Sequence, residues 1–242
     1  MNATALITGG SKRVGKAMAK HLASRGWNIV IHYNASEKPA AELELELQKK
    51  YPRQKFTRIQ TDLANESEVE GLTRAVISNI GPFHLLINNA SIFQQAYLSK
   101  TTSKLFDDHI SVNLRAPLLL IRDFANHCKT GNIINLVDTR ITTNKTNFAA
   151  YSLSKKALWH LTQMAALEFA PHIRVNAIAP GVTLPPEDKN EDYLWALAEK
   201  IPMKKPGGTG PILKSIDFIL ENIHLTGQLI FADGGENLGQ NA

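Results

Sequence analysis

Short apolar runs alternate with longer segments of mixed polarity along the whole chain. The runs have strand length and lie at 3–8, 27–33, 55–60, 83–88, 132–138, 173–177 and 228–232. Several are almost continuously apolar, which is typical of strands buried on both faces of a parallel sheet. The segments between them have helical length and lie at 14–23, 36–50, 65–79, 102–124 and 147–170. This alternation predicts one α/β domain over residues 1–242, with a doubly wound parallel sheet of about seven strands and helices on both faces.

Composition narrows the class of protein without pointing to a partner. The chain has 242 residues, of which 43% are hydrophobic, and a formal net charge of +5, which fits a folded domain with a sizeable core. The single cysteine, Cys128, excludes an intrachain disulfide and favours a reducing compartment. No apolar run reaches the roughly 20 residues of a membrane span, and a strand beginning at residue 3 leaves no room for a signal peptide. We therefore expect a cytoplasmic protein that does not enter a membrane.

Metal and nucleic-acid chemistry have no support in the sequence. The eight histidines show no close ligand spacing such as H-E-x-x-H, so we expect no metal site. Basic residues occur in doublets, and no basic run is interleaved with aromatic side chains, so we expect no nucleic-acid partner.

A turn of small residues follows the first predicted strand and leads into the first predicted helix. It reads Thr8-Gly9-Gly10-Ser11-Lys12-Arg13-Val14-Gly15. Small residues let the backbone approach a pyrophosphate, and the helix N-terminus adds N–H groups and the positive end of its dipole. The turn departs from the plain G-x-G-x-x-G pattern. Its place at the start of a βαβ unit nevertheless predicts a dinucleotide site, the alternative being an ordinary tight turn.

The end of the second predicted strand bears on which dinucleotide is bound. An NAD site usually has an acidic residue there that binds the ribose. Here the segment reads His32-Tyr33-Asn34-Ala35-Ser36, with no carboxylate before Glu37, while Lys12 and Arg13 add positive charge beside the turn. Both features favour a 2′-phosphate and hence NADPH. The alternative is that Glu37 reaches the ribose and the basic pair is only solvated.

A tyrosine and a lysine lie four residues apart in the segment Tyr151-Ser152-Leu153-Ser154-Lys155. On a helix, side chains at this spacing share a face. A phenol with a pKa near 10 is a poor acid–base catalyst at neutral pH, and a neighbouring ammonium group lowers that pKa. The pair is therefore a candidate catalytic site, although the spacing alone is common in helices.

Several further motifs follow one another in a fixed order. They are Asp62-Leu63, Asn88-Asn89-Ala90, Asn113, Pro180-Gly181, Leu225-Thr226-Gly227-Gln228 and Asp233-Gly234-Gly235. Together with the glycine-rich turn and the Tyr151/Lys155 pair, they make the chain similar to the short-chain dehydrogenase/reductase family over nearly its whole length.

This resemblance implies a Rossmann-type fold and a role for each matched residue. Tyr151 would donate a proton, and Lys155 would lower its pKa and hold the nicotinamide ribose. Asn113 would hold a structural water in a proton relay. Asp62 would meet the adenine, and Asn89 would line the cofactor cleft.

Two further expectations concern the relay and the oligomer. Pro117 lies four residues after Asn113 and has no N–H to give its carbonyl, which leaves that carbonyl for water; equally, Pro117 merely begins a new helix. A homo-oligomer, either dimer or tetramer, is common in the family. Trp159, Leu161 and Phe169 are candidates for its interface, with core burial as the alternative.

One departure from the family pattern changes the expected substrate. The position thirteen residues before the tyrosine is usually serine, and here it is Asp138. An ionised carboxylate only accepts hydrogen bonds, so it would repel a carbonyl oxygen. It suits a substrate that offers N–H groups, or one that gains positive charge as a C=N bond is reduced. The alternatives are that burial protonates Asp138 or that activity has been lost.

The departures resemble the pteridine reductase branch of the family, which includes dihydromonapterin and dihydropteridine reductases. Shared features are the Lys12-Arg13-Val14-Gly15 turn, the His32-Tyr33 strand end with Ser36, the Asn89-Ala90-Ser91-Ile92-Phe93 segment, and Asp138. Ala35 differs, because the branch often has arginine there, so binding of a 2′-phosphate would depend on Lys12 and Ser36. The pterin would stack between the nicotinamide and Phe93, the alternative for Phe93 being a core aromatic. Ser91 and Arg13 would bind its polar edge or the cofactor phosphates.

The resemblance thus predicts residue sets for each part of the reaction. The catalytic set is Tyr151, Lys155, Asp138 and Asn113. The cofactor set is Gly9, Lys12, Arg13, Val14, Gly15, His32, Tyr33, Asn34, Ser36, Asp62, Leu63, Asn89, Ala90, Ser91, Tyr151, Lys155, Pro180 and Gly181. The substrate set is Arg13, Ser91, Phe93, Asp138 and Tyr151, and the irregular segment 181–190 would shape the pocket for the substrate side chain.

The expected activity is NADPH-dependent reduction of a C=N bond in a dihydropterin, such as dihydrobiopterin, dihydromonapterin or dihydrofolate, to the tetrahydro form. One alternative is a carbonyl reductase, such as a 3-oxoacyl reductase. The other is a non-catalytic regulator that binds NADP(H), against which the intact Tyr151/Lys155 pair weighs.

Overall fold

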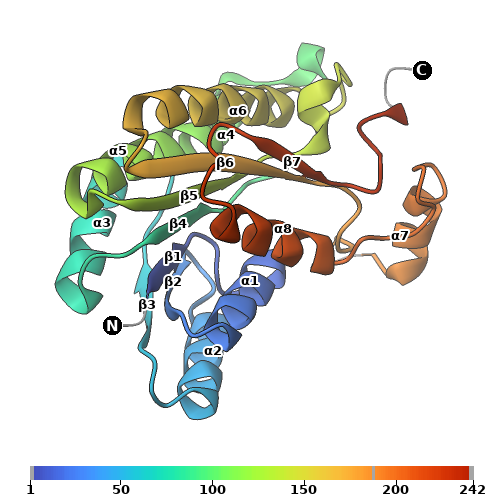
Figure 1. The fold of residues 1–242 in the computed structure, drawn as a ribbon. Coiled ribbons are helices and arrows are strands. Elements are labelled where there is room, and N and C mark those ends of the chain that lie inside the picture. The colour runs from blue at the N-terminus through green and yellow to red at the C-terminus, as the bar shows by residue number, and fades with distance from the viewer. Residues whose placement is uncertain (1–2, 187–188, 240–242) are drawn as a thin grey trace.

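In a computed structural model of the chain, which describes residues 3–186 and 189–239, seven parallel strands form one sheet (Figure 1). Their order across the sheet is β3-β2-β1-β4-β5-β6-β7. Their bounds are Thr4–Ile7 (β1), Asn28–Tyr33 (β2), Phe56–Gln60 (β3), Leu85–Asn88 (β4), Gly131–Leu136 (β5), Ile173–Pro180 (β6) and Leu229–Ala232 (β7). The predicted α/β fold is confirmed, and each predicted apolar run overlaps one of these strands.

Helices cover both faces of the sheet and bury a separate apolar layer on each (Figure 1). One layer joins the sheet to α1 (Arg13–Ser24), α2 (Glu37–Lys50) and α8 (Gly210–Glu221). The other joins it to α3 (Glu66–Ile80), α5 (Ala116–Cys128) and α6 (Ala149–Phe169). The shorter helices are α4 (Ser103–Ile110), which contacts α6, and α7 (Glu191–Ala198), which lies beyond the end of β6.

Some element boundaries differ from the sequence prediction for local reasons. The predicted helix 102–124 consists of α4 and α5 joined through a π-helical turn at Ser111–Arg115, and it extends to Cys128. β6 continues three residues past Ala177, because Ile178 pairs with both β5 and β7 and the next two residues pair with β7. Of the irregular segment 181–190, residues 187 and 188 lie outside the described residues, as do residues 1–2 and 240–242 of the expected domain.

The strand order places the site. It reverses between β1 and β4, whose carboxyl ends lie side by side, and such a reversal is where open α/β sheets hold ligands. The glycine-rich turn follows β1, Asn89 follows β4, Asp138 follows β5 and Gly181 follows β6, so the predicted residues converge at one edge.

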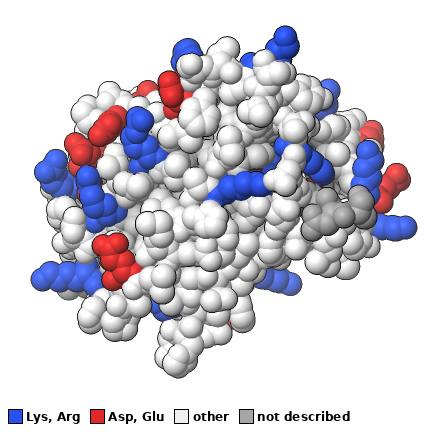
Figure 2. Space-filling model, turned by 90° about the horizontal axis from the view of Figure 1, so that it is seen from above, with Lys and Arg blue, Asp and Glu red and all other residues white. Residues whose placement is uncertain are grey.

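The surface adds two general findings. Within the described residues, no helix combines the length and the apolar character that crossing a membrane requires. On the face seen in Figure 2, Lys and Arg side chains are scattered, with Asp and Glu side chains among them.

Candidate active site

The turn after β1 is packed so tightly that two of its positions accept only glycine. Gly9 has a φ of +61°, and a Cβ there would lie 3.1 Å from the Cα of Ala90. A Cβ on Gly15 would lie 2.0 Å from the carbonyl oxygen of Gly9. Lys12, the N-cap of α1, makes no side-chain cap hydrogen bond to the first turn of the helix. The turn and the helix N-terminus therefore form a close backbone surface whose N–H groups suit an anion.

His32, the fifth residue of β2, fixes this turn to the sheet. Its Nδ1 accepts a hydrogen bond from the backbone N–H of Gly9 at 3.0 Å, so its Nε2 carries the proton and donates to the carbonyl of Thr61 at 3.0 Å. Burial lowers the pKa of His32 to about 4, which keeps the ring neutral at physiological pH. The predicted cofactor residue His32 is thus a buried support for the turn.

Residues predicted to bind the adenosine half gather beside the turn, where β2 and β3 end. The hydroxyls of Ser11 and Ser36 are 2.7 Å apart. Asn34 donates to the carboxylate of Asp62 at 3.3 Å, and the side chain of Lys12 is exposed next to them. The side chains of Tyr33 and Leu63, in contrast, are buried in the two apolar layers, so only their backbone faces this region.

The segment after β4 is tied to the turn by polar side chains. Asn89 Nδ2 donates to the carbonyls of Thr8 and Gly9, at 2.8 and 3.2 Å. The backbone N–H groups of Asn89 and Ala90 in turn donate to Thr8 Oγ1. Asn89 therefore braces the turn, which is a more specific position than the predicted place along the cleft wall.

Asn113 holds the same segment from the other side. Its Oδ1 accepts hydrogen bonds from the N–H of Ile92 at 2.9 Å and the hydroxyl of Ser91 at 3.1 Å. Its Nδ2 donates to the carbonyl of Ile92 and to Ser154 Oγ. The side chain is fully used as a brace, so a water relay at this residue would have to use its backbone carbonyl. Pro117 lies in the first turn of α5, as expected if it only begins a helix. That the Asn113 carbonyl binds water stays a prediction.

Tyr151 and Asp138 meet at the centre of the site. The Tyr151 hydroxyl donates to Asp138 Oδ2 at 2.7 Å, and the other carboxylate oxygen accepts from the N–H of Arg140 at 2.7 Å. Burial, and then the charge and hydrogen bond of Asp138, raise the pKa of Tyr151 well above its usual value. The expectation that Lys155 lowers this pKa is therefore wrong for this structure, because the carboxylate holds the proton on the phenol.

Lys155 lies on the same helix but its ammonium group points elsewhere. Its Nζ donates to the carbonyl of Leu136 at 2.8 Å and lies 5.8 Å from the centre of the Tyr151 ring. Burial lowers the pKa of Lys155 to about 8, with Asp138 acting in the opposite direction. Lys155 is thus a buried cation held at the end of β5, one helical turn from Tyr151.

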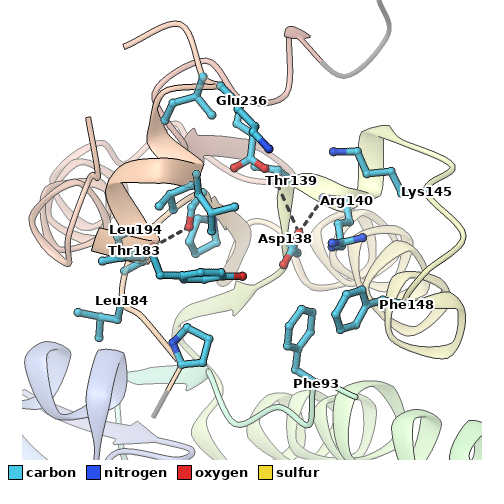
Figure 3. Close-up of a pocket in the computed structure, with 18 of the residues that line it drawn as sticks. Phe93, Asp138, Thr139, Arg140, Lys145, Phe148, Thr183, Leu184, Leu194 and Glu236 are labelled. Carbon is cyan, nitrogen blue, oxygen red and sulfur yellow. Dashed lines mark hydrogen bonds between the residues drawn. The ribbon is translucent and has the colours of Figure 1, made fainter. Parts of the chain in front are cut away.

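Phe93 belongs to an aromatic stack. Its ring lies parallel to that of Phe148 (Figure 3), with centroids 4.2 Å apart and an interplanar angle of 8°. It also meets the ring of Tyr151 edge-on, with centroids 4.6 Å apart. The side chain is 54% exposed, so the alternative of a core aromatic is wrong. The guanidinium of Arg140 covers the Phe148 ring at 4.6 Å. Phe148 was not predicted, although its place three residues before Tyr151 brings it to the same end of α6.

A cavity of about 570 Å³ is lined by Phe93, Asp138, Arg140 and Phe148. Its volume is typical of small-molecule sites. Figure 3 shows Phe93, Phe148 and Asp138 on one side, with Thr183, Leu184 and Leu194 opposite them. Further lining residues are Thr139, Lys145, Pro180, Gly181, Val182, Pro186, Tyr193, Leu197, Lys200, Ile201, Glu236 and Gly239.

Arg13 spans from the turn to the loop after β6. Its Nη2 donates to the carbonyl of Pro185 at 2.8 Å and contacts that of Leu184 at 3.5 Å. Its φ of +50° is a conformation that favours glycine, the residue usual in the family here. The guanidinium of Arg13 thus binds the loop in this structure, and its contact with substrate or phosphate stays a prediction. Among the described residues no group of His, Cys, Asp and Glu side chains could hold a metal ion.

Comparisons with known proteins agree with this geometry. The family model for short chain dehydrogenases matches residues 3–192. The chain is 31% identical to the 3-oxoacyl-[acyl-carrier-protein] reductase FabG of Staphylococcus epidermidis, over 97% of this chain and 99% of that protein. It is 28% identical to the dihydromonapterin reductase of an Enterobacter species, over 96% of each.

A solved structure adds a three-dimensional comparison. The crystal structure of FolM alternative dihydrofolate reductase 1 from Brucella canis, complexed with NADP, superposes with a TM-score of 0.90 at 35% identity. The match covers 98% of this chain and 95% of that one.

Proposed function

The chain belongs to the short-chain dehydrogenase/reductase family, and from that we propose that it reduces a C=N bond of a dihydropterin with NADPH as the hydride donor. The observation that carries this proposal is the carboxylate of Asp138, which lines the pocket and accepts a hydrogen bond from the hydroxyl of Tyr151. The Brucella structure complexed with NADP and the similarity to a dihydromonapterin reductase support the cofactor and the substrate class.

The residues present fit a phosphorylated dinucleotide. The glycine positions bring backbone close enough to hold a pyrophosphate, since a Cβ on Gly15 would overlap the Gly9 carbonyl. Ser11, Ser36 and Lys12 would hold the 2′-phosphate, for no carboxylate follows β2 before Glu37. When bound, NADPH supplies the hydride. The remaining residues of the predicted cofactor set contribute to the same cleft or brace it.

Tyr151 is the proposed proton donor to the substrate nitrogen. The phenol is protonated at neutral pH, so it carries the proton to be donated. Its raised pKa makes it a weaker acid than a free tyrosine, and we expect proton transfer to follow release of its hydrogen bond to Asp138. Hydride addition to the carbon and proton transfer to the nitrogen complete the reduction of the C=N bond. Asp138 only accepts hydrogen bonds when ionised, so it would bind N–H groups of the pterin and favour the positive charge that develops on the ring. The cation of Lys155 would hold the nicotinamide ribose.

The aromatic stack gives the pocket a flat wall. Phe93 leans on Phe148 through one face, which fixes its ring plane beside Tyr151. A planar pterin ring would stack against this wall, with Ser91 and Arg13 at its polar edge. For Arg13 this requires release of the Pro185 carbonyl.

We also propose a homo-oligomer in the cytoplasm. The predicted interface residues Trp159, Leu161 and Phe169 pack, partly buried, against the core. The exposed apolar side chains of α6 are instead Leu153, Met164 and Leu167, which are 49%, 66% and 85% exposed. These side chains suit a helix–helix contact between subunits better than the predicted ones.

Steady-state kinetics test the proposal. Turnover is measured with NADPH and NADH against dihydrobiopterin, dihydromonapterin, dihydrofolate and a 3-oxoacyl thioester. We expect turnover of dihydropterins, with NADPH preferred. The second candidate, 3-oxoacyl reduction, is favoured by the identity to the Staphylococcus enzyme. Faster turnover of the thioester than of any dihydropterin would reject the pterin assignment, and a preference for NADH would reject the cofactor assignment.

A further inference from the structure

The candidate pocket has a basic end that the proposed reduction does not use. Arg140, Lys145 and Lys200 line the same cavity as Asp138, although they come from segments before α6 and after α7. In Figure 3, Lys145 extends from its loop toward the cavity, on the side of Glu236 and away from Phe93. The pocket therefore combines an acceptor at the reacting centre with cations farther out.

The three cationic side chains differ in the contacts that they make within the protein. Arg140 covers the Phe148 ring and donates from Nη1 to Asn147 Oδ1 at 3.1 Å, so it is held in the wall. Lys145 and Lys200 are exposed, and no described carboxylate lies within the 4.0 Å of an ion pair with either ammonium group. These two lysines can thus bind an anion without first breaking an ion pair to a described residue.

The pocket lining has fewer acidic than basic side chains. The carboxylate of Asp138 is engaged by Tyr151 and by the N–H of Arg140. Glu236 is the other acidic side chain among the lining residues. Burial raises the pKa of Glu236, which disfavours its charged form, while Lys145 acts in the opposite direction. The outer end of the pocket therefore keeps more positive than negative side chains.

Apolar side chains lie on the wall opposite Asp138 and Phe93 (Figure 3). Leu184, Leu194 and Leu197 line the pocket between the loop after β6 and α7. A ligand that fits has a flat head with N–H groups, an apolar or aromatic middle and an anionic tail.

We propose that Lys145 and Lys200 form a subsite for carboxylates on the side chain of the dihydropterin. This rests on the proposed function and deepens it. The enzyme accordingly prefers a dihydropterin whose side chain ends in carboxylates, such as dihydrofolate, to one with a neutral polyol side chain, such as dihydromonapterin. A lysine–carboxylate pair at an exposed rim is worth up to about a fivefold change in affinity, and such rim charges act on association and on salt dependence.

The experiment compares wild-type enzyme with K145Q, K200Q, the double variant and K214Q. Lys214 is an exposed lysine on α8 that does not line the pocket, so K214Q is a matched control for the loss of one charge. Kcat/KM is measured for dihydrofolate and dihydromonapterin at 50 and 500 mM NaCl.

We expect wild-type kcat/KM to be higher for dihydrofolate. Each single substitution should lower it about three- to fivefold, mainly through KM, and the double substitution about tenfold. Dihydromonapterin should change less than twofold, K214Q should match wild type, and high salt should reduce only the dihydrofolate value. If wild-type enzyme turns over dihydromonapterin at least as well, or if the lysine variants affect both substrates alike, the subsite is rejected and the function stands. If no dihydropterin is turned over, both are rejected.

Discussion

Acidification should loosen the glycine-rich turn through one buried side chain, His32. Its pKa is lowered to about 4 in the folded protein, against about 6.5 in an unfolded chain. The unfolded state therefore binds more protons between these values, so stability is complete above pH 6.5 and falls as the pH decreases toward 4. Integration of this linkage gives a loss of about 2 kcal/mol between pH 7.5 and pH 5, and about 3 kcal/mol once both states are protonated.

The structure also says what protonation does locally. The Nδ1 of His32 accepts the N–H of Gly9, and a proton on Nδ1 would set two donors against each other. Affinity of the folded protein for NADPH should therefore decrease only as the pH approaches 4, the folded-state pKa of His32, and so at lower pH than most of the stability loss.

Urea unfolding at pH values from 5 to 7.5 measures the effect, with H32N as the control. The Asn oxygen can take the place of Nδ1 as the acceptor for Gly9 but does not titrate. Other acid-sensitive groups contribute to both proteins and cancel when the H32N curve is subtracted. We expect the wild type to lose about 2 kcal/mol more than H32N from pH 7.5 to 5, while NADPH affinity measured by fluorescence stays nearly constant over that range because the folded ring remains neutral. Equal pH dependence in the two proteins would refute this account of His32.

Three more predictions concern the reacting centre. Asp138→Ala should lower kcat for a dihydropterin about 100-fold or more while leaving the Kd of NADPH unchanged, and unchanged turnover in a steady-state assay would remove Asp138 from the mechanism. Lys155→Met should abolish turnover yet raise the free energy of unfolding at pH 7 by about 1–2 kcal/mol in urea titration. The lowered pKa of Lys155 implies that burying its charge costs roughly 3 kcal/mol, which exceeds the cost of losing its hydrogen bond to the carbonyl of Leu136. A less stable variant would contradict this. Phe148→Leu should raise KM for the dihydropterin up to about tenfold, since the stack that holds Phe93 is worth about 0.5–1.5 kcal/mol, and an unchanged KM would show that the stack does not position substrate.

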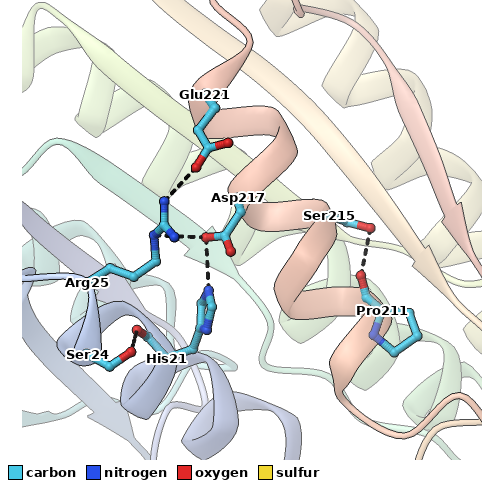
Figure 4. Close-up of polar contacts among 7 residues, drawn as sticks. All are labelled: His21, Ser24, Arg25, Pro211, Ser215, Asp217 and Glu221. Atoms are coloured by element: carbon cyan, nitrogen blue, oxygen red, sulfur yellow. Dashed lines mark hydrogen bonds and ion pairs between the residues drawn. The ribbon is translucent and has the colours of Figure 1, made fainter.

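The fold was predictable because each strand is a short apolar run, and the polar residues on either side mark where the run begins and ends. The elements missed near the C-terminus depend on contacts between distant segments. α8 buries Ile212, Ile216 and Ile219 in the apolar layer that it shares with α1. On its polar face, Asp217 is hydrogen-bonded to His21 and ion-paired with Arg25, at the C-terminal end of α1 (Figure 4). Those partners are almost 200 residues apart in sequence, so no local spacing indicates them.

The sequence predicted which residues come together at the candidate site. It predicted less well which partner each side chain contacts. Asn89 and His32 were expected to line a cofactor cleft, and both spend their polar atoms on the backbone of the turn. Arg13 reaches the loop after β6. A polar side chain bonds to a group that the fold brings within about 3 Å of it. In this site those groups belong to loops that follow different strands, and the sequence does not show which loops are adjacent.

Tyr151 shows how such a choice changes the chemistry. The i, i+4 spacing to Lys155 is visible in sequence and favours a phenolate, whereas the hydrogen bond to Asp138 spans thirteen residues and favours a phenol. Only the second partner touches the hydroxyl, because the Lys155 ammonium is turned to the carbonyl of Leu136. The phenol therefore carries the proton that a reductase delivers, and its raised pKa makes it a weak acid until the hydrogen bond to Asp138 is released. The same carboxylate would repel the oxygen of a ketone. On the proposed function, Asp138 in place of the family's serine would keep Tyr151 protonated and favour a nitrogen-containing substrate.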